Sequence, residues 1–177
     1  ASPIGRSSNN GLDTAHPFRP VDFWALGQSA MRGKALCLMD GTYTGASFMI
    51  TPTAGITGTS LQPITIRAIN EGAVFIDGQF ARNPLLLNEN SWWVIEGIDA
   101  GNGSGASNSI AITLTASSND NIFRRFIGSN SNPSVLSNEH VFTVEDSSRN
   151  LFEDVAFFGF GRNTVTMFGL TTGSHKF

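Results

Sequence analysis

The stretch DNIFRRFIGSN, residues 120–130, decides the fold because two other stretches repeat its pattern. SWWVIEGIDAGNG (91–103) and RNLFEDVAFFGFG (149–161) align with it without gaps at their centres. The alignment places Val94, Ile122 and Leu151 at one position, 28 and 29 residues apart. The same alignment forms three further columns: Ile95, Phe123 and Phe152; Ile98, Phe126 and Val155; and Asn121 with Asn150.

Outward from these repeats, the chain reads as short strand-like runs separated by turns rich in Gly, Ser and Asn. ITIRA, AVFID, SIAITLTA and HVFTVED are such runs. Repeats of this length that contain strands and no helix are typical of a β-solenoid, in which equivalent residues of successive coils stack. A sandwich or jelly roll is the alternative, but it predicts no constant register between strands nearly 30 residues apart. We therefore predict an all-β, right-handed parallel β-helix whose interior holds the apolar columns and whose turns hold the asparagine column.

Composition excludes several classes of protein. Only 14% of the 177 residues are charged and the net charge is −3, which argues against a nucleic-acid binder. Hydrophobic residues make up 40% of the chain, as expected for a folded protein. No apolar run approaches the roughly 18 residues of a membrane span. Cys37 is the single cysteine, so an intramolecular disulfide is excluded.

We expect one domain over residues 1–177, with a polar leader at 1–20, a capping helix at 21–33 and coils from 34 onward. Pro20 and Asp22 favour a helix start, and Gly33 favours its end. Only seven residues follow the last strand-like run, NTVTMFGL, and they are too few for a second cap. We therefore expect the last coil to be covered by another subunit, by downstream sequence or by a folded-back segment; the first of these alternatives is a homo-oligomer formed through this end.

Four stretches resemble the pectate-lyase-like superfamily of right-handed parallel β-helices. They are NNGLDTAHPF (9–18), MDGTYTG (39–45), QPITIRAINEGAVFIDG (62–78) and SWWVIEGI (91–98). The similarity is greatest to the N-terminal part of the chondroitinase-B and alginate-lyase-like branch. It implies a helix-capped solenoid. It does not imply one activity, because the superfamily includes lyases, glycosidases, epimerases, adhesins and tailspikes. The lyase branch uses a Lys/Arg pair and often calcium on later coils, and no motif here matches them, so catalytic residues stay unassigned.

The alignment also produces two charged columns. Glu96, Arg124 and Glu153 share one position, and Gly97, Arg125 and Asp154 share the next. One interpretation is a ladder of surface ion pairs, each contributing less than about 1 kcal/mol. The other is a groove in which an arginine binds an acidic sugar. Adjacent strand residues alternate between faces, so both columns reach solvent only if the chain bends there.

Trp92 and Trp93 are the other candidates for ligand binding. Neighbouring strand residues point to opposite faces, so we expect one indole in the core and one outside. The outer indole either stacks on a sugar ring or packs beneath a loop.

No metal site is predicted, since His16, His140 and His175 occupy unrelated repeat positions. We expect no cofactor, although carboxylates such as Asp77, Asp99, Glu145 and Asp146 suit either calcium or the capping of backbone N–H groups.

The resemblance implies a secreted or surface carbohydrate-active β-helix, or a fragment of one, with polysaccharide as its partner. If it is an enzyme, a lyase acting on acidic polysaccharide is the implied activity. The alternative is a structural or adhesive β-helix that assembles end to end.

Overall fold

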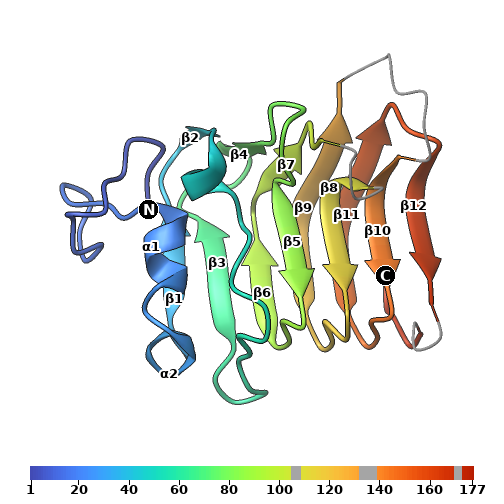
Figure 1. Ribbon diagram of the computed structural model, residues 1–177, viewed down its shortest axis with the longest axis horizontal. Helices are drawn as coiled ribbons and strands as arrows, with labels where there is room; N and C mark the ends of the chain where they lie inside the picture. The colour runs from blue at the N-terminus through green and yellow to red at the C-terminus, as the bar shows by residue number, and fades with distance from the viewer. Residues whose placement is uncertain (105–108, 132–138, 170–172) are drawn as a thin grey trace.

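The computed structural model describes residues 1–104, 109–131, 139–169 and 173–177, and it shows a parallel β-helix (Figure 1). The helical segments are α1 (Pro20–Trp24), α2 (Gln28–Met31) and η1 (Ala46–Phe48). The strands are β1 (Ala35–Leu38), β2 (Gly41–Tyr43), β3 (Ile64–Ala68), β4 (Val74–Asp77), β5 (Leu85–Asn88), β6 (Trp93–Glu96), β7 (Asp99–Gly101), β8 (Ser109–Thr115), β9 (Ile122–Asn130), β10 (His140–Glu145), β11 (Leu151–Gly159) and β12 (Asn163–Phe168). Among the described residues, no helix is long and apolar enough to cross a membrane.

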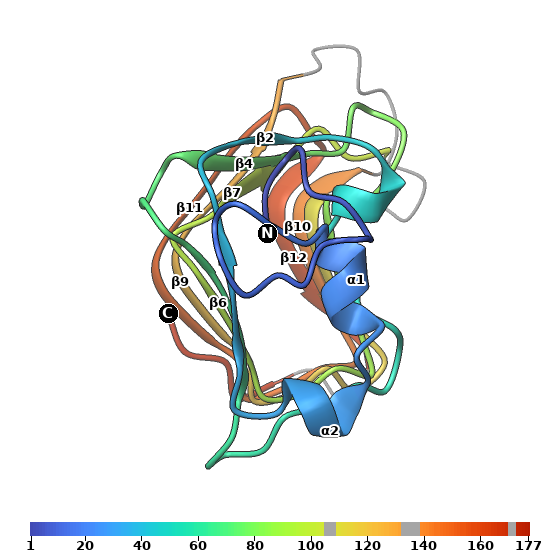
Figure 2. The same ribbon diagram turned by 90° about the vertical axis from the view of Figure 1, so that its left-hand side faces the viewer.

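Every pairing between these strands is parallel, and two sheets result. One runs β5–β8–β10–β12. The other contains β1, β3, β6, β9 and β11 in one part and β2, β4 and β7 in the other, because the long β9 pairs with β6 through its first half and with β7 through its second. Viewed along the axis, the coils superpose around a common interior (Figure 2).

The register between coils is the one that the repeats predict. Ile95 lies beside Phe123, which lies beside Phe152, and all three side chains are buried. Phe126 is buried beside the half-buried Val155, and Ile98 is buried in the same core. The interior columns and the constant register are therefore confirmed.

Both charged columns reach the surface because the chain bends between them. Gly97, Arg125 and Asp154 have φ values of 69°, 47° and 52°, in the left-handed region. A left-handed residue interrupts the alternation of side chains along the strand, so position 124 and position 125 both face outward. The bend recurs at one position in three coils and marks the corner at which β9 and β11 pass from one face to the next.

The N-terminal cap forms, but the single helix expected over residues 21–33 is wrong. Two short helices replace it, since Gly27 adopts φ 80° between α1 and α2. Phe23, Trp24 and Met31 close the apolar interior, and Trp24 meets Trp93 edge-on at 5.8 Å between ring centroids.

The opposite end of the helix exposes apolar side chains. Phe158, Phe160, Val165 and Phe168 have exposed fractions of 56%, 50%, 39% and 42%. The final segment, Gly173–Phe177, pairs with the previous coil through the bridges Ser148–Gly173 and Leu151–Lys176.

Candidate functional site

A buried polar turn precedes each of β6, β9 and β11. Asn90, Ser118 and Ser147 occupy equivalent places in it and are fully buried. The backbone N–H of Asn90 donates to the Ser118 hydroxyl at 3.2 Å, and that of Ser118 donates to the Ser147 hydroxyl at 3.1 Å. Each coil is thereby tied to the next by a side chain that accepts a hydrogen bond from the main chain.

The asparagine column forms a second ladder beside the first. The backbone N–H of Trp93 donates to the side-chain oxygen of Asn121 at 2.9 Å. The backbone N–H of Asn121 donates in the same way to the side-chain oxygen of Asn150 at 2.8 Å. The side-chain amides of Asn121 and Asn150 also donate to the backbone carbonyls of Asn90 and Ser118 in the preceding coils, at 3.0 Å each. The final segment, Gly173–Phe177, continues the ladder, because Nδ1 of His175 accepts a hydrogen bond from the backbone N–H of Asn150 at 3.3 Å.

Just outside these ladders, four residues with left-handed backbone form a column along the helix axis. Trp92, Asp120, Arg149 and Ser174 have φ values of 62°, 57°, 55° and 56°. Each directly precedes a ladder residue, so the column lies at the rim of the turn. A left-handed conformation is costly for a bulky side chain such as Trp92.

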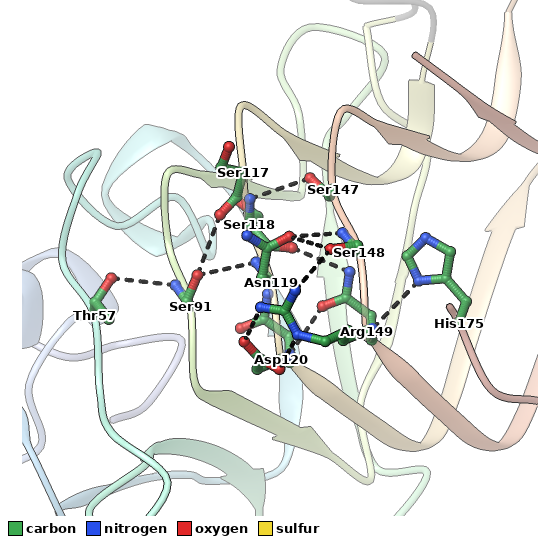
Figure 3. A network of polar contacts seen from close by, with 12 residues as sticks. Thr57, Ser91, Ser117, Ser118, Asn119, Asp120, Ser147, Ser148, Arg149 and His175 are labelled. Carbon is green, nitrogen blue, oxygen red and sulfur yellow. Dashed lines mark hydrogen bonds and ion pairs between the residues drawn. The ribbon is translucent and has the colours of Figure 1, made fainter. Parts of the chain in front are cut away.

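Arg149 is held in a defined orientation at this rim (Figure 3). Its Nε and Nη2 donate to the two carboxylate oxygens of Asp120 at 2.8 and 2.7 Å, and its Nη1 donates to the Ser148 hydroxyl at 3.2 Å. Ser148 in turn donates from its N–H and hydroxyl to the Asn119 side-chain oxygen at 2.7 and 3.1 Å. The bond to Asp120 raises the pKa of Arg149 above its ordinary value. The Arg149 side chain remains 55% exposed, so it is both anchored and accessible.

Trp92, Asp120, Arg149 and Ser174 line an open groove of about 430 Å³, the Trp92 groove. Ile122 and Leu151 supply its apolar floor, and Lys176 lies at its far end. Among the described residues, the Lys176 ammonium has no carboxylate partner. The groove therefore combines a half-buried tryptophan, a short apolar surface and two cations against one carboxylate.

The two tryptophans separate as expected. Trp93 is fully buried, and its indole N–H donates to the Ile56 carbonyl at 2.9 Å. This burial removes Trp93 from the candidates for contact with a polysaccharide. Trp92 is half-buried and borders the groove.

Sequence reasoning missed Asp120, Arg149 and Lys176. The signal was present in the repeats, because Asp120 and Arg149 align with Trp92. The side chain at this position points outward in every coil because its backbone is left-handed. The alternation of side chains along a regular strand does not predict that orientation.

Arg124 and Arg125 both form ion pairs with carboxylates of other coils, but the partners of Arg125 differ from those that the two columns suggest. Arg124 pairs with Glu153 as expected. Arg125 pairs with Glu96 and also with Glu71, whose Oε2 lies 2.9 Å from Arg125 Nε. The expected pair with Asp154 is absent among the described residues.

Arg125 reaches Glu71 across the intervening coil because that coil carries a glycine. A Cβ on Gly97 would lie 3.4 Å from Cγ of Glu71, so the glycine leaves the path between the two charged groups open. The groove around them, the Arg125 groove, has a volume of about 410 Å³ and is lined by two arginines, Arg67 and Arg125, and two glutamates. A role of these arginines and acids in substrate binding stays a prediction.

Among the described residues, no three His, Cys, Asp or Glu side chains gather to hold a metal ion. His140 and His175 are separate, and burial lowers the pKa of each.

The parallel β-helix fold is shared with the solved structure of a pectate lyase. The chain aligns with the crystal structure of pectate lyase Pel9A at 19% identity and a TM-score of 0.55, covering 88% of this chain and 46% of the enzyme. A PL6-family polysaccharide lyase from Pseudopedobacter saltans aligns at 14% identity and a TM-score of 0.40, covering 76% of this chain and 46% of that protein. The chain thus spans less than half of either protein. No family model and no curated protein matches the sequence.

Proposed function

We propose that this β-helix binds acidic polysaccharide outside the cell or at its surface, through the Trp92 groove. The observation that carries the proposal is that the half-buried Trp92 lines one groove together with Arg149 and Lys176. An indole face packs against the C–H face of a sugar ring, and cations bind carboxylates by charge-assisted hydrogen bonds. The fold shared with a pectate lyase supports the same class of partner.

The Trp92 groove suits an acidic polymer better than the Arg125 groove does. In the Arg125 groove two arginines face two glutamates, and Arg125 already contacts both acids. In the Trp92 groove two cations face one carboxylate, so a positive charge is left for a ligand.

The geometry supports binding more strongly than catalysis. In β-elimination a base removes the proton next to the uronate carboxyl group while a cation stabilises the developing charge. Asp120 is the carboxylate of the groove, and both of its oxygens are hydrogen-bonded to Arg149. A more specific proposal is that the protein also cleaves acidic polysaccharide as a lyase. It is tested by the ultraviolet absorbance of unsaturated uronates released from polygalacturonate, alginate or chondroitin sulfate.

Isothermal titration with the same polymers tests binding, and neutral galactan is the control ligand. We expect Trp92→Asn to weaken binding about three- to tenfold, since an aromatic contact is worth about 0.5–1.5 kcal/mol. Asn tolerates the left-handed backbone, so the fold should be retained. Phe80→Asn is the matched control, because Phe80 is also aromatic, exposed and left-handed, with φ 55°, and lies outside the groove.

We also expect binding to persist in EDTA, since the groove presents its own cations. Loss of binding in EDTA would make calcium part of the site. Equal affinity for galactan and polygalacturonate, or equal effects of the two Asn variants, would contradict the proposal.

A structural role through end-to-end assembly is the second candidate. The exposed Phe158, Phe160 and Phe168 favour it, because an apolar surface at a strand edge is a site of association.

A further inference from the structure

The Trp92 groove follows the axis of the β-helix, so its contacts repeat from coil to coil. Trp92, Asp120, Arg149 and Ser174 precede residues that are paired in register: Val94 with Ile122, Ile122 with Leu151, and Leu151 with Lys176. Paired strands lie about 4.8 Å apart, so the column from Trp92 to Ser174 is about 14 Å long.

This repeat matches the geometry of an extended sugar polymer. One pyranose residue of a 1,4-linked chain advances by close to the distance between two coils. A chain lying along the axis therefore meets one column position per sugar, whereas a chain lying across the axis meets one or two positions in all.

The side chains along the column differ in a useful order. Trp92 provides an aromatic platform at one end. Arg149 lies two coils further on, fixed by Asp120, and Lys176 belongs to the next coil. The aromatic end suits a ring face, and the cationic end suits carboxylates.

We infer that the Trp92 groove binds a polyuronate chain parallel to the helix axis, with one sugar per coil over four coils. The first sugar packs on Trp92, and the carboxylates of the third and fourth meet Arg149 and Lys176. This inference rests on the proposed function and adds the direction and register of the ligand.

Titration of the full chain with oligogalacturonates of two to six sugars tests the register. We expect affinity to rise with each sugar up to four and to stay level beyond. Lys176→Gln should weaken the tetramer about two- to fivefold, as for an exposed charge pair, and should leave the dimer unchanged. A dimer anchored on Trp92 ends two coils before Lys176.

Lys34→Gln is the matched control, because Lys34 is an exposed lysine beside the N-terminal cap and loses the same charge. We expect Lys34→Gln to leave the affinities for both the dimer and the tetramer unchanged. If no oligogalacturonate and no polymer binds, the proposed function fails. If they bind but affinity is level from the dimer onward, or if Lys176→Gln affects dimer and tetramer equally, the axial register is wrong and the proposed function stands.

Discussion

Phe123 lies at the centre of an aromatic column in the core. Its ring stacks on Phe152 at 5.4 Å between centroids and meets Phe126 edge-on at 5.8 Å. Replacing it with Ala leaves a cavity between two coils, so we expect Phe123→Ala to lower the free energy of unfolding by about 3–5 kcal/mol. Urea denaturation measures this loss.

Phe158→Ala is the matched control for that substitution. Phe158 lies on β11 but is 56% exposed, so we expect its replacement to change the free energy of unfolding by less than about 0.5 kcal/mol. A loss below about 1 kcal/mol for Phe123→Ala would place its column outside the core.

At the scale of residues, the sequence predicts the interior well and the rim poorly. Phe123 and Ile95 could be assigned to the core because a repeat must bury the same positions in every coil. Trp92 and Arg149 follow a different rule, since their left-handed backbone depends on a turn geometry that side-chain periodicity does not encode. Left-handed residues are usually Gly, Asn or Asp, and here Trp and Arg hide that signal.

Among the elements, the segment Gly173–Phe177 shows how the ladders join one coil to the next. Its His175 stands where Asn121 and Asn150 stand in earlier coils, and it accepts a hydrogen bond from Asn150. Burial lowers the pKa of His175. Burial and the nearby Arg162 also lower that of His140. Both side chains are therefore harder to protonate in the folded protein than in the unfolded chain.

The sign of the pH dependence follows from these directions. Above the unfolded histidine pKa of about 6.5 both histidines are neutral in both states, and their contribution to stability is complete. As pH falls below that value the unfolded chain takes up protons first, so stability is lost as pH falls toward the folded pKa values. We expect a lower urea midpoint at about pH 5.5 than at about pH 7.5.

The variant His175→Asn restores the ladder residue of the earlier coils and removes one titrating group. With His140→Asn in addition, the difference between the two urea midpoints should largely disappear. An unchanged difference in the double variant would assign the pH dependence to other groups. Asp99, whose pKa burial raises, acts with the opposite sign, because the folded state protonates it first and is favoured as pH falls.

The register between coils was predicted correctly, whereas the helices and strands were predicted with mixed success. The repeats indicated β6, β9 and β11 because their apolar positions coincide. The N-terminal cap was predicted as one helix, and Gly27 divides it, since the chain must turn to cover the interior with both Trp24 and Met31.

The two ends of the β-helix differ in how far other parts of the chain cover their apolar side chains. The N-terminal end buries Phe23 and Trp24 beneath the cap, whereas β11 and β12 expose Phe158, Val165 and Phe168. We expect the 177-residue chain to self-associate through β11 and β12, since β12 is the last strand of its sheet and both strands carry exposed apolar side chains. Analytical ultracentrifugation should show a mass that rises with protein concentration.

The variant Phe158→Lys with Phe168→Lys should shift that equilibrium toward the monomer, because like charges then face each other at the contact. Ile4→Lys with Leu12→Lys is the control, since these residues are 82% and 86% exposed in the N-terminal leader. A monomer at all concentrations would exclude association through this end.

Asn121 and Asn150 occupy equivalent positions 29 residues apart, and this repeat length affects how such a protein can evolve. The core of each coil packs against its two neighbours, so an in-frame duplication of one repeat inserts a complete layer without disturbing the packing of distant ones. The new layer would bring its own core side chains, its own ladder residue and one more position at the rim. Growth by duplication would thus lengthen the groove in whole steps, and later substitutions at that single rim position would diversify what it binds.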